Sequence, residues 1–367
     1  MKIGLLTLPV ETGYGSILQA VALKHQLQLR GHEVVLIRRH GKRRDSLKRI
    51  LGRTVKKYLL GKDVIIRLSK KERDEFPIIT QYTQPFIDKY LQPYTKMYYS
   101  TWSMRQINNL GFDAIVVGSD QVWRPRYMQN VADFFLYEVN DSISKYAYAA
   151  SLGTEDWRFS EKETMICGEA VRKFKAVSVR ESSSVELCEK HFHIKPTFVL
   201  DPTLLCDSSF YSSFIDDHKF EREGKLCAYV LDHDDMMGMV NKYANLLSTE
   251  PVFPHGKVED KTAPVNERIV KPVSTWLDCI KSSVAVITDS FHGMVFSIIF
   301  HRPFVVSINH QEGSARFLSL LKLLHLEHRI VNPDTDFTAL QPIDWDEVDS
   351  ILNKMRKISN DFLDGIK

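Results

Sequence analysis

Short apolar runs alternate with amphipathic segments along the first half of the chain. Residues 2–10 have the length of a buried strand, and apolar residues then recur at helical spacing until Gly31. Residues 34–37 form a second apolar run. A strand, a turn that contains glycine, a helix and a second strand start a βαβ unit, which predicts a parallel sheet. Further strands are predicted at residues 113–117, 146–151, 176–179 and 197–200, and a helix at residues 161–173.

The alternation restarts after a polar stretch at residues 207–223. Strands follow at residues 226–231, 252–253, 284–288 and 304–307, and helices at 236–247, 276–281, 294–300 and 315–324. Two such runs in 367 residues predict an α/β fold with two Rossmann-like domains that face each other across a cleft. We assign residues 1–205 to an N-terminal domain and 206–340 to a C-terminal domain. Residues 341–367 form a last helix, a candidate to pack back on the first domain.

The composition excludes several classes of protein. With 44% hydrophobic and 26% charged residues, the chain can form ordinary buried cores and is not disordered. Its five cysteines include no C-x-x-C pair, so neither a disulfide framework nor a zinc site is expected. The N-terminus does not resemble a signal peptide, and no apolar run approaches the roughly 20 residues of a spanning helix. We therefore expect a cytoplasmic protein.

Positive charge is concentrated in residues 38–73, where fifteen Lys and Arg residues stand against three acidic residues. Apolar residues recur there at helical spacing, namely Leu47, Ile50, Leu51, Val55, Tyr58 and Leu59. Such a helix either lies on an anionic membrane surface or packs on its own domain with a solvated basic face. Nucleic acid is not an expected partner, because the segment lacks a known nucleic-acid-binding motif and the net charge of the chain is only +3.

A histidine stands where the predicted strand 284–288 gives way to an apolar helix. Asp289 and Ser290 end the strand, and His292 follows at the start of the helix. Backbone N–H groups at a helix N-terminus favour an anion, and an imidazole can act as an acid near neutral pH. His292 is therefore either a catalytic acid beside a bound anion or a structural histidine next to a capping residue.

Two arginines are candidates to hold that anion. Arg180 follows the strand 176–179 and can clamp a carboxylate or phosphate through two hydrogen bonds, or can form an ion pair with Glu181 or another carboxylate. Arg316 begins a helix after the strand 304–307, and can reach the same anion or lie on the helix surface.

Two turns of the first domain are predicted to line the cleft. The turn Gly13-Tyr14-Gly15 follows the first strand, and Gly118-Ser119-Asp120-Gln121-Val122-Trp123 follows a later one. Glycines allow the backbone to approach a ligand, while Asp, Gln and Trp suit sugar hydroxyls and a sugar face. The dinucleotide fingerprint, the Walker sequence and the Gly-x-Ser-x-Gly elbow are missing. The histidine pairs at 191/193 and 325/328 have no suitably spaced acidic residue, so no metal is expected.

Six short motifs together resemble the polysaccharide pyruvyl transferase family. They are Tyr14-Gly15-Ser16-Ile17-Leu18-Gln19, Gly118-Ser119-Asp120-Gln121-Val122-Trp123, Ala150-Ser151-Leu152-Gly153, Ser178-Val179-Arg180-Glu181, Leu200-Asp201-Pro202-Thr203 and Thr288-Asp289-Ser290-Phe291-His292-Gly293. The motifs follow the family's order and span residues 1–330. The resemblance implies a GT-B-like fold, phosphoenolpyruvate as donor, and a ketal linkage to two hydroxyls of one sugar residue.

The resemblance also implies that residues 1–205 form the acceptor side and residues 206–340 the phosphoenolpyruvate side, and it implies roles for individual residues. His292 matches the family's proposed catalytic histidine, and Arg180 matches an arginine that holds phosphoenolpyruvate. Some relatives carry another arginine two places before the histidine, where this chain has Ser290. We expect the donor site to be completed by Ser290, Phe291, Gly293 and Arg316.

We hypothesise that protonated His292 supplies the proton for the donor or assists the leaving phosphate. Asp120 would orient or deprotonate an acceptor hydroxyl, and the acceptor would contact Gly13, Tyr14, Gly15, Gln121 and Trp123. No metal, nucleotide or other cofactor is required by this mechanism.

The acceptor implied by the resemblance is a sugar, with galactose as the first expectation, in a bacterial surface polysaccharide such as a capsule. A polyprenyl-linked oligosaccharide is a candidate acceptor, and residues 38–73 would then place the protein on the inner face of the membrane. The alternative is a nucleotide-sugar glycosyltransferase of the same two-domain architecture.

Overall fold

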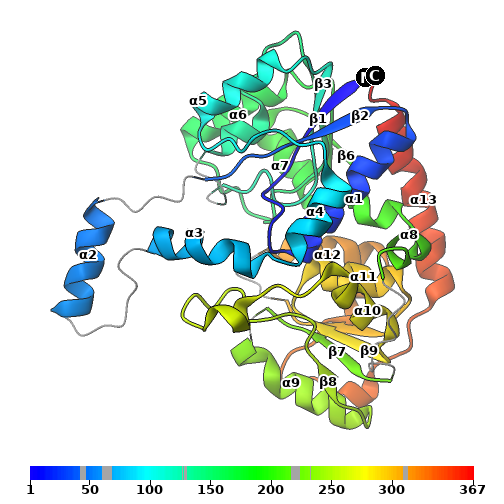
Figure 1. Ribbon diagram of the computed structural model, residues 1–367. Helices are drawn as coiled ribbons and strands as arrows, with labels where there is room; N and C mark the ends of the chain where they lie inside the picture. The colour runs from blue at the N-terminus through cyan, green and yellow to red at the C-terminus, as the bar shows by residue number, and fades with distance from the viewer. Residues whose placement is uncertain are drawn as a thin grey trace.

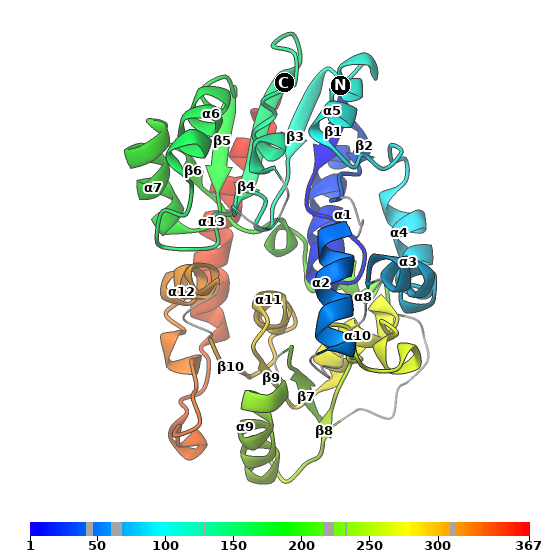
Figure 2. The ribbon, with the colours of Figure 1, turned by 90° about the vertical axis from the view of Figure 1, so that its left-hand side faces the viewer.

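The computed structural model describes residues 1–41, 47–59, 68–125, 127, 130–215, 224–231, 233–308 and 313–367. Two parallel sheets lie one above the other, with helices around them (Figures 1 and 2). The prediction of an α/β fold with two Rossmann-like domains is confirmed by these sheets.

The first sheet has six strands in the order β2-β1-β3-β4-β5-β6, and all neighbouring pairs are parallel. Its strands are β1 (Lys2–Leu6), β2 (Glu33–Ile37), β3 (Ala114–Val117), β4 (Ser144–Ala150), β5 (Ala176–Val179) and β6 (Thr197–Phe198). The central strand β3 is buried along its whole length, as expected for a strand covered on both faces. The first strand is shorter than predicted, because the chain turns after Leu6 and the Thr7 hydroxyl donates to the Ser119 carbonyl at 3.0 Å.

The second sheet has four parallel strands in the order β10-β9-β7-β8. They are β7 (Leu226–Tyr229), β8 (Pro251–Val252), β9 (Ala285–Thr288) and β10 (Phe304–Val306). Every strand predicted in this half is present; β7, β9 and β10 are one or two residues shorter than predicted, and β8 is shifted by one residue. The two sheets are therefore built from separate parts of the chain, with β6 as the last strand of one and β7 as the first strand of the other.

The helices connect the strands and cover the sheets. They are α1 (Tyr14–Leu29), α2 (Leu47–Tyr58), α3 (Leu68–Ile79), α4 (Thr83–Leu91), α5 (Thr101–Met104), α6 (Glu161–Val171), α7 (Ser182–Phe192), α8 (Ser208–Ser212), α9 (His233–Leu246), α10 (Val273–Ser282), α11 (Phe291–Ile299), α12 (Ser314–Leu323) and α13 (Trp345–Asp364). In the described part of the chain, no helix combines the length and the apolar composition needed to cross a membrane.

The two halves share one hydrophobic core. Side chains of α1 from the first half and of α10 and α11 from the second belong to a single buried cluster. Within it the ring of Tyr14 stacks on that of Trp276, with ring centroids 5.1 Å apart. Burial of apolar surface between the halves favours one fixed arrangement of the two sheets.

The last helix, α13, runs beside both halves (Figure 1). Near its start Trp345 stacks on His301 of the second half, with ring centroids 4.8 Å apart. Near its end Ser359 Oγ accepts a hydrogen bond from the Leu200 N–H at 3.0 Å, and Asp364 pairs with Arg30 at 2.8 Å. The helix thus bridges the second half and the first.

Candidate active site

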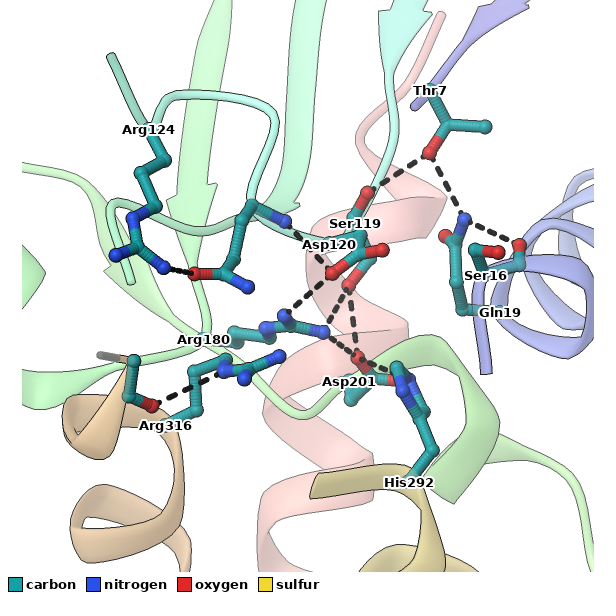
Figure 3. Close-up of polar contacts among 12 residues, drawn as sticks. Thr7, Ser16, Gln19, Ser119, Asp120, Arg124, Arg180, Asp201, His292 and Arg316 are labelled. Carbon is teal, nitrogen blue, oxygen red and sulfur yellow. Dashed lines mark hydrogen bonds and ion pairs between the residues drawn. The ribbon is translucent and has the colours of Figure 1, made fainter. Parts of the chain in front are cut away.

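Polar side chains from both sheets meet where their strands end. Ser119 and Asp120 follow β3, Arg180 follows β5, Asp201 follows β6, and His292 lies in the first turn of α11 after β9. The carboxyl ends of parallel strands share one edge of a sheet, and here the edges of the two sheets face each other. The resulting network is drawn in Figure 3.

Arg180 is buried at the centre of this network and is only 5% exposed. Its guanidinium pairs with the carboxylate of Asp201, donates to Asp120 Oδ1 at 3.2 Å and to Ser119 Oγ at 3.2 Å. Its Nε lies 3.5 Å from a carboxylate oxygen of Glu181. Burial alone would lower the pKa of Arg180, but the carboxylates of Asp201, Asp120 and Glu181 raise it. The sequence left open an anion clamp or an ion pair, and in this structure Arg180 forms ion pairs.

Asp201 connects the arginine to the histidine. One of its carboxylate oxygens accepts from the Ser119 hydroxyl at 2.9 Å and lies 3.8 Å from His292 Nε2. The other accepts from the backbone N–H and the hydroxyl of Thr203, at 3.0 and 2.7 Å. Burial would raise the pKa of Asp201, but His292, Arg180 and Thr203 together hold it far below its usual range. Asp201 is therefore ionised at neutral pH.

No role was predicted for Asp201, although the motif Leu200-Asp201-Pro202-Thr203 contains it. The available signal was its position, since Asp201 directly follows the predicted strand 197–200. That strand belongs to the same sheet as the strand that carries Arg180, so both side chains emerge at one edge.

His292 is held between Asp201 and the first turn of α1. Its side chain is 8% exposed, and within the described residues its Nε2 has no hydrogen-bond partner. On the other side, a Cβ atom added to Gly15 would lie 2.0 Å from His292 Nδ1. Only glycine at position 15 leaves room for the ring in this position. A buried ring nitrogen without a hydrogen bond, next to an ionised carboxylate, keeps His292 a candidate for the acid–base role.

The first turn of α11 is capped by its own residue Ser290. The Ser290 hydroxyl accepts from the Gly293 N–H at 3.4 Å, and the Ser290 N–H donates to Thr288 Oγ1 at 3.0 Å. A Cβ on Gly293 would lie 2.4 Å from Thr288 Oγ1, so the glycine permits close packing on β9. Ser290 thus has the capping role that the sequence left open, and Gly293 packs on β9, while the contact of both residues with the donor stays a prediction.

The ring of Phe291 lies near two guanidinium groups. The central carbon of Arg180 is 4.8 Å from the ring centroid, and that of Arg316 is 5.4 Å away. Arg316 donates from Nε to the Gly313 carbonyl at 3.3 Å, and no carboxylate of the described residues lies within 4 Å of it. Burial, and then the charge of Arg180, lower the pKa of Arg316 to about 10. Arg316 is therefore a partly buried cation that has no carboxylate partner among the described residues, which makes it the better candidate to receive an anion.

Asp120 adopts a left-handed backbone conformation, with φ of 76°. Its carboxylate accepts from the Gln121 N–H at 2.9 Å in addition to Arg180. Burial would raise the pKa of Asp120, but the charges of Arg180, His292 and Arg316 lower it overall. A carboxylate with a lowered pKa is a weak base, so Asp120 suits the orientation of a hydroxyl better than its deprotonation.

Gln121 lies in a group of side chains that the sequence did not identify. Its amide oxygen accepts from Arg124 at 2.8 Å, and Arg124 also donates to the hydroxyl of Tyr127 at 2.8 Å. Tyr127 is 48% exposed. Gly153, with φ of 69°, allows this arrangement because a Cβ there would lie 2.2 Å from the Gln121 oxygen. Arg124 and Tyr127 are therefore further candidates to contact a ligand.

Two of the residues predicted to contact the acceptor lie inside the protein instead. Trp123 is fully buried, stacks on Phe135 with ring centroids 4.6 Å apart and donates from its indole N–H to the Phe134 carbonyl at 3.0 Å. Tyr14 is 2% exposed and its hydroxyl donates to the Lys271 carbonyl at 3.0 Å. These predictions need correction, because neither ring offers a face to a sugar. Gly13 precedes α1 and accepts from the Ser16 hydroxyl at 2.8 Å.

The histidine pairs noted in the sequence make other contacts. His191 stacks on Trp157 with ring centroids 4.1 Å apart, and His325 lies 2.9 Å from a carboxylate oxygen of Glu347. Within the described residues, no group of three or more His, Cys, Asp or Glu side chains is arranged to hold a metal ion.

Comparison with known proteins gave a family match and several structural similarities. The family model described as polysaccharide pyruvyl transferase matches residues 14–311. No curated protein matches the sequence.

The similar solved structures share the overall length of the chain but little of its sequence. The UDP-GlcNAc 2-epimerase from Methanocaldococcus jannaschii is 11% identical, over 97% of this chain and 93% of that chain, with a TM-score of 0.49. S. aureus MnaA in a co-structure with UDP is 13% identical over 99% and 90%, with a TM-score of 0.48. MurG from Acinetobacter baumannii is 12% identical over 99% of each chain, with a TM-score of 0.43.

Proposed function

The chain belongs to the polysaccharide pyruvyl transferase family, and from this premise we propose that it transfers a pyruvyl group from phosphoenolpyruvate to two hydroxyls of one sugar residue. The observation that carries the proposal is the convergence of the six motifs on one site. Gly15 touches His292, Ser119 and Arg180 both bond to Asp201, and Gly153 packs on Gln121. Segments far apart in the sequence thus contribute to a single polar centre between the sheets.

The donor would bind next to Arg316 and Phe291. Arg316 supplies a positive charge and N–H donors that match a carboxylate or a phosphate, and no close carboxylate of the described residues neutralises it. Arg180 would act mainly through its ion pairs, which hold Asp120 and Asp201 in place. This assignment differs from the family expectation, in which the matching arginine holds the donor directly.

His292 would act as the general acid. Its Nε2 is the atom without a partner in the described residues, and ionised Asp201 at 3.8 Å attracts a protonated imidazole. Transfer of a proton from the protonated His292 ring to the methylene carbon of phosphoenolpyruvate converts that carbon to a methyl group and leaves a cation-like carbon that bears the carboxylate and the phosphate. Asp201 stabilises the charged form of the ring before the transfer, and Gly15 fixes the position of the ring.

The sugar then attacks twice. The first hydroxyl forms a C–O bond to the cation-like carbon and releases its proton. The C–O bond to phosphate breaks, and attack by the second hydroxyl closes the ketal ring. Of the two hydroxyl protons, one restores protonated His292 and the other leaves on the phosphate. Free phosphate and the pyruvylated sugar are the products. Asp120 would accept a hydrogen bond from one attacking hydroxyl, and this orientation lowers the barrier by reducing the entropy lost on reaction.

A cavity of about 1000 Å³ past the carboxyl ends of β7 and β8 offers room for the rest of the acceptor. It is lined by Phe253, His255, Lys257, Glu267 and Lys271 among others, which combine an aromatic ring with hydrogen-bonding groups suited to sugars. Leu231 lines the cavity, and its N–H donates at 2.8 Å to Asp289, three residues before His292. We propose that an oligosaccharide of a surface-polysaccharide repeat unit, with galactose at the reacting end, extends from His292 into this cavity. A lipid-linked form of this oligosaccharide is the proposed substrate.

The proposed function is tested by measuring phosphate release from phosphoenolpyruvate with galactosides as acceptors. The wild-type protein should release phosphate and form an acceptor with an added pyruvyl ketal, which mass spectrometry detects. Thermal shift provides a separate test of the donor, since a ligand at 100 times its Kd stabilises the native state by about 2.7 kcal/mol. Stabilisation by a nucleotide sugar and none by phosphoenolpyruvate would favour the glycosyltransferase alternative.

A further inference from the structure

Helix α2 carries large apolar side chains that are exposed to solvent. Leu51 is 64% exposed, Val55 45% and Tyr58 72%, and Leu59 directly after the helix is 77% exposed. The interpretation that this segment packs its apolar residues on its own domain is therefore wrong for these four residues. Single exposed apolar side chains are common, whereas a group on one helix indicates an interaction surface.

The other side of α2 is basic. With 3.6 residues per turn, Leu51, Val55 and Tyr58 fall on one face, and Arg53 and Lys56 fall on the opposite one. Lys56 and Lys57 are both exposed. Basic residues of the whole segment 38–73 outnumber acidic ones by fifteen to three, so most of this charge cannot be neutralised within the segment.

The position of α2 relates this surface to the candidate active site. The segment leaves the first sheet after β2, at the edge where Asp120 and Arg180 also emerge from their strands. Figure 1 shows α2 to the side of the molecule, away from both sheets.

Helix α3, which follows α2, is fixed to the second half of the chain. Glu75 pairs with Arg268 and Glu72 with Lys261, each at 2.6 Å. The Val270 N–H donates to the carbonyl of Ile79 at 2.9 Å. Helix α3 is thus held against the loop that also lines the cavity proposed for the acceptor.

An anionic membrane surface matches both faces of α2. The apolar side chains would enter the boundary between head groups and acyl chains, while the basic side chains would contact anionic head groups. A second copy of the chain is a poorer match, because its α2 would bring the same positive charge to the contact. With 12 residues, α2 is about 18 Å long, which suits a position along the surface and not across the bilayer.

We propose that α2 docks the protein on an anionic membrane, with its axis in the plane of the surface. Docking would hold the edge of the first sheet that carries the polar network near the bilayer. Membrane docking of α2 does not depend on the reaction, although docking would deliver the enzyme to a lipid-linked acceptor.

The test is sedimentation of the full-length protein with vesicles, in the absence of phosphoenolpyruvate and acceptor. Vesicles of phosphatidylcholine alone are compared with vesicles that contain phosphatidylglycerol. Wild-type protein should bind the anionic vesicles, and binding should weaken as salt is raised.

The double variant Lys56→Glu/Lys57→Glu should bind at least about 30-fold more weakly, since each basic residue near an anionic surface contributes about a factor of five. The double variant Leu51→Ser/Leu59→Ser should bind at least about tenfold more weakly.

Matched control variants separate a local effect from a general one. Lys354→Glu/Lys357→Glu makes the same change in charge at exposed positions of α13, and Met165→Ser removes a side chain on α6 that is 67% exposed. Both should bind like wild type. Equal binding of wild-type protein and the α2 variants would overturn the proposal, as would a failure of the wild-type protein to bind anionic vesicles. Self-association abolished by Leu51→Ser/Leu59→Ser, without vesicle binding, would assign α2 to a contact between copies instead. Activity on a soluble galactoside should be unchanged in the α2 variants, so a failure of vesicle binding leaves the proposed function testable.

Discussion

The backbone of Gly15 lies against the imidazole of His292, although the two residues belong to different halves of the chain. A Cβ atom at Gly15 would come within 2.0 Å of Nδ1 and 2.3 Å of Cγ of that ring. These distances are far shorter than any contact between non-bonded heavy atoms. The first turn of α1 therefore forms one wall of the site and sets the position of His292 relative to Asp201.

We predict that Gly15→Ala lowers kcat/KM by at least about 100-fold, because the added methyl group must displace the general acid. The fold should be retained, since alanine favours a helix by up to about 1 kcal/mol relative to glycine. Steady-state kinetics and thermal unfolding measure the two effects. The control is Gly238→Ala, an exposed position of α9 where an added Cβ would meet no atom within 4 Å. Full activity in Gly15→Ala would show that the ring can move without loss.

Asp201→Asn should lower both activity and stability. The change leaves buried Arg180 without its principal partner, and removal of one member of a buried ion pair typically costs about 3–5 kcal/mol. It also removes the negative charge beside His292, so kcat/KM should fall by at least about 100-fold. Urea unfolding at pH 7 measures the first effect. An unchanged free energy of unfolding would contradict the network of Figure 3.

The same variant tests the ionisation of Asp201 through the pH dependence of stability. The folded protein holds the pKa of Asp201 below its ordinary value of about 3.9, so this carboxylate stabilises the native state above that pH. The stabilisation is lost as the pH falls below about 4. We expect the difference in unfolding free energy between wild type and Asp201→Asn to be constant from pH 7 to about pH 5, and to narrow at lower pH. A difference that grows on acidification would refute an ionised Asp201.

Arg316→Ala should raise KM for phosphoenolpyruvate by about tenfold or more, because a hydrogen bond to a charged group is worth about 1.5–3 kcal/mol. Arg158→Ala, at an exposed ion pair with Asp156, is the matched control and should leave KM unchanged. Burial and Arg180 lower the pKa of Arg316 to about 10, so its charge is complete at pH 7 and is lost as the pH rises through that value. KM for the donor should rise over the same range in wild type and less in Arg316→Ala.

Trp123→Phe should destabilise the protein without a change in the acceptor KM. The variant loses the indole hydrogen bond to Phe134 and part of the stacking on Phe135, which together predict a loss of about 1–3 kcal/mol. Unfolding in urea and acceptor titrations check the two expectations. A higher acceptor KM with unchanged stability would restore the role in sugar binding that the sequence suggested.

The sequence predicted the strands well, because fully buried parallel strands appear as short continuous apolar runs. Residues 114–117 and 285–288 are such runs, and both lie at the centre of a sheet. It also predicted that His292, Arg180 and Asp120 follow strands, which was enough to place them at the same edges. Boundaries were less accurate where polar residues near a strand end, such as Thr7, bond to the turn after a neighbouring strand instead.

The direction of individual side chains could not be predicted in the same way. Asp120 and Trp123 occupy one turn, yet the Asp120 carboxylate joins the polar network and the Trp123 indole enters the core. Tyr14 and Gly15 are adjacent, yet Tyr14 stacks on Trp276 and Gly15 contacts His292. Such differences depend on how the two halves pack, which a linear pattern of apolar residues does not contain.

The central claim is that His292 transfers a proton to the methylene carbon of phosphoenolpyruvate as a ketal forms on a sugar. The most direct measurement is the mass of the product after incubation with phosphoenolpyruvate and a galactoside in D₂O, for wild type and for His292→Ala. The wild-type product should carry a pyruvyl ketal with one deuterium in its methyl group, and His292→Ala should form at least about 100-fold less of it. A ketal without deuterium at that carbon, or equal yields from the two proteins, would contradict the mechanism.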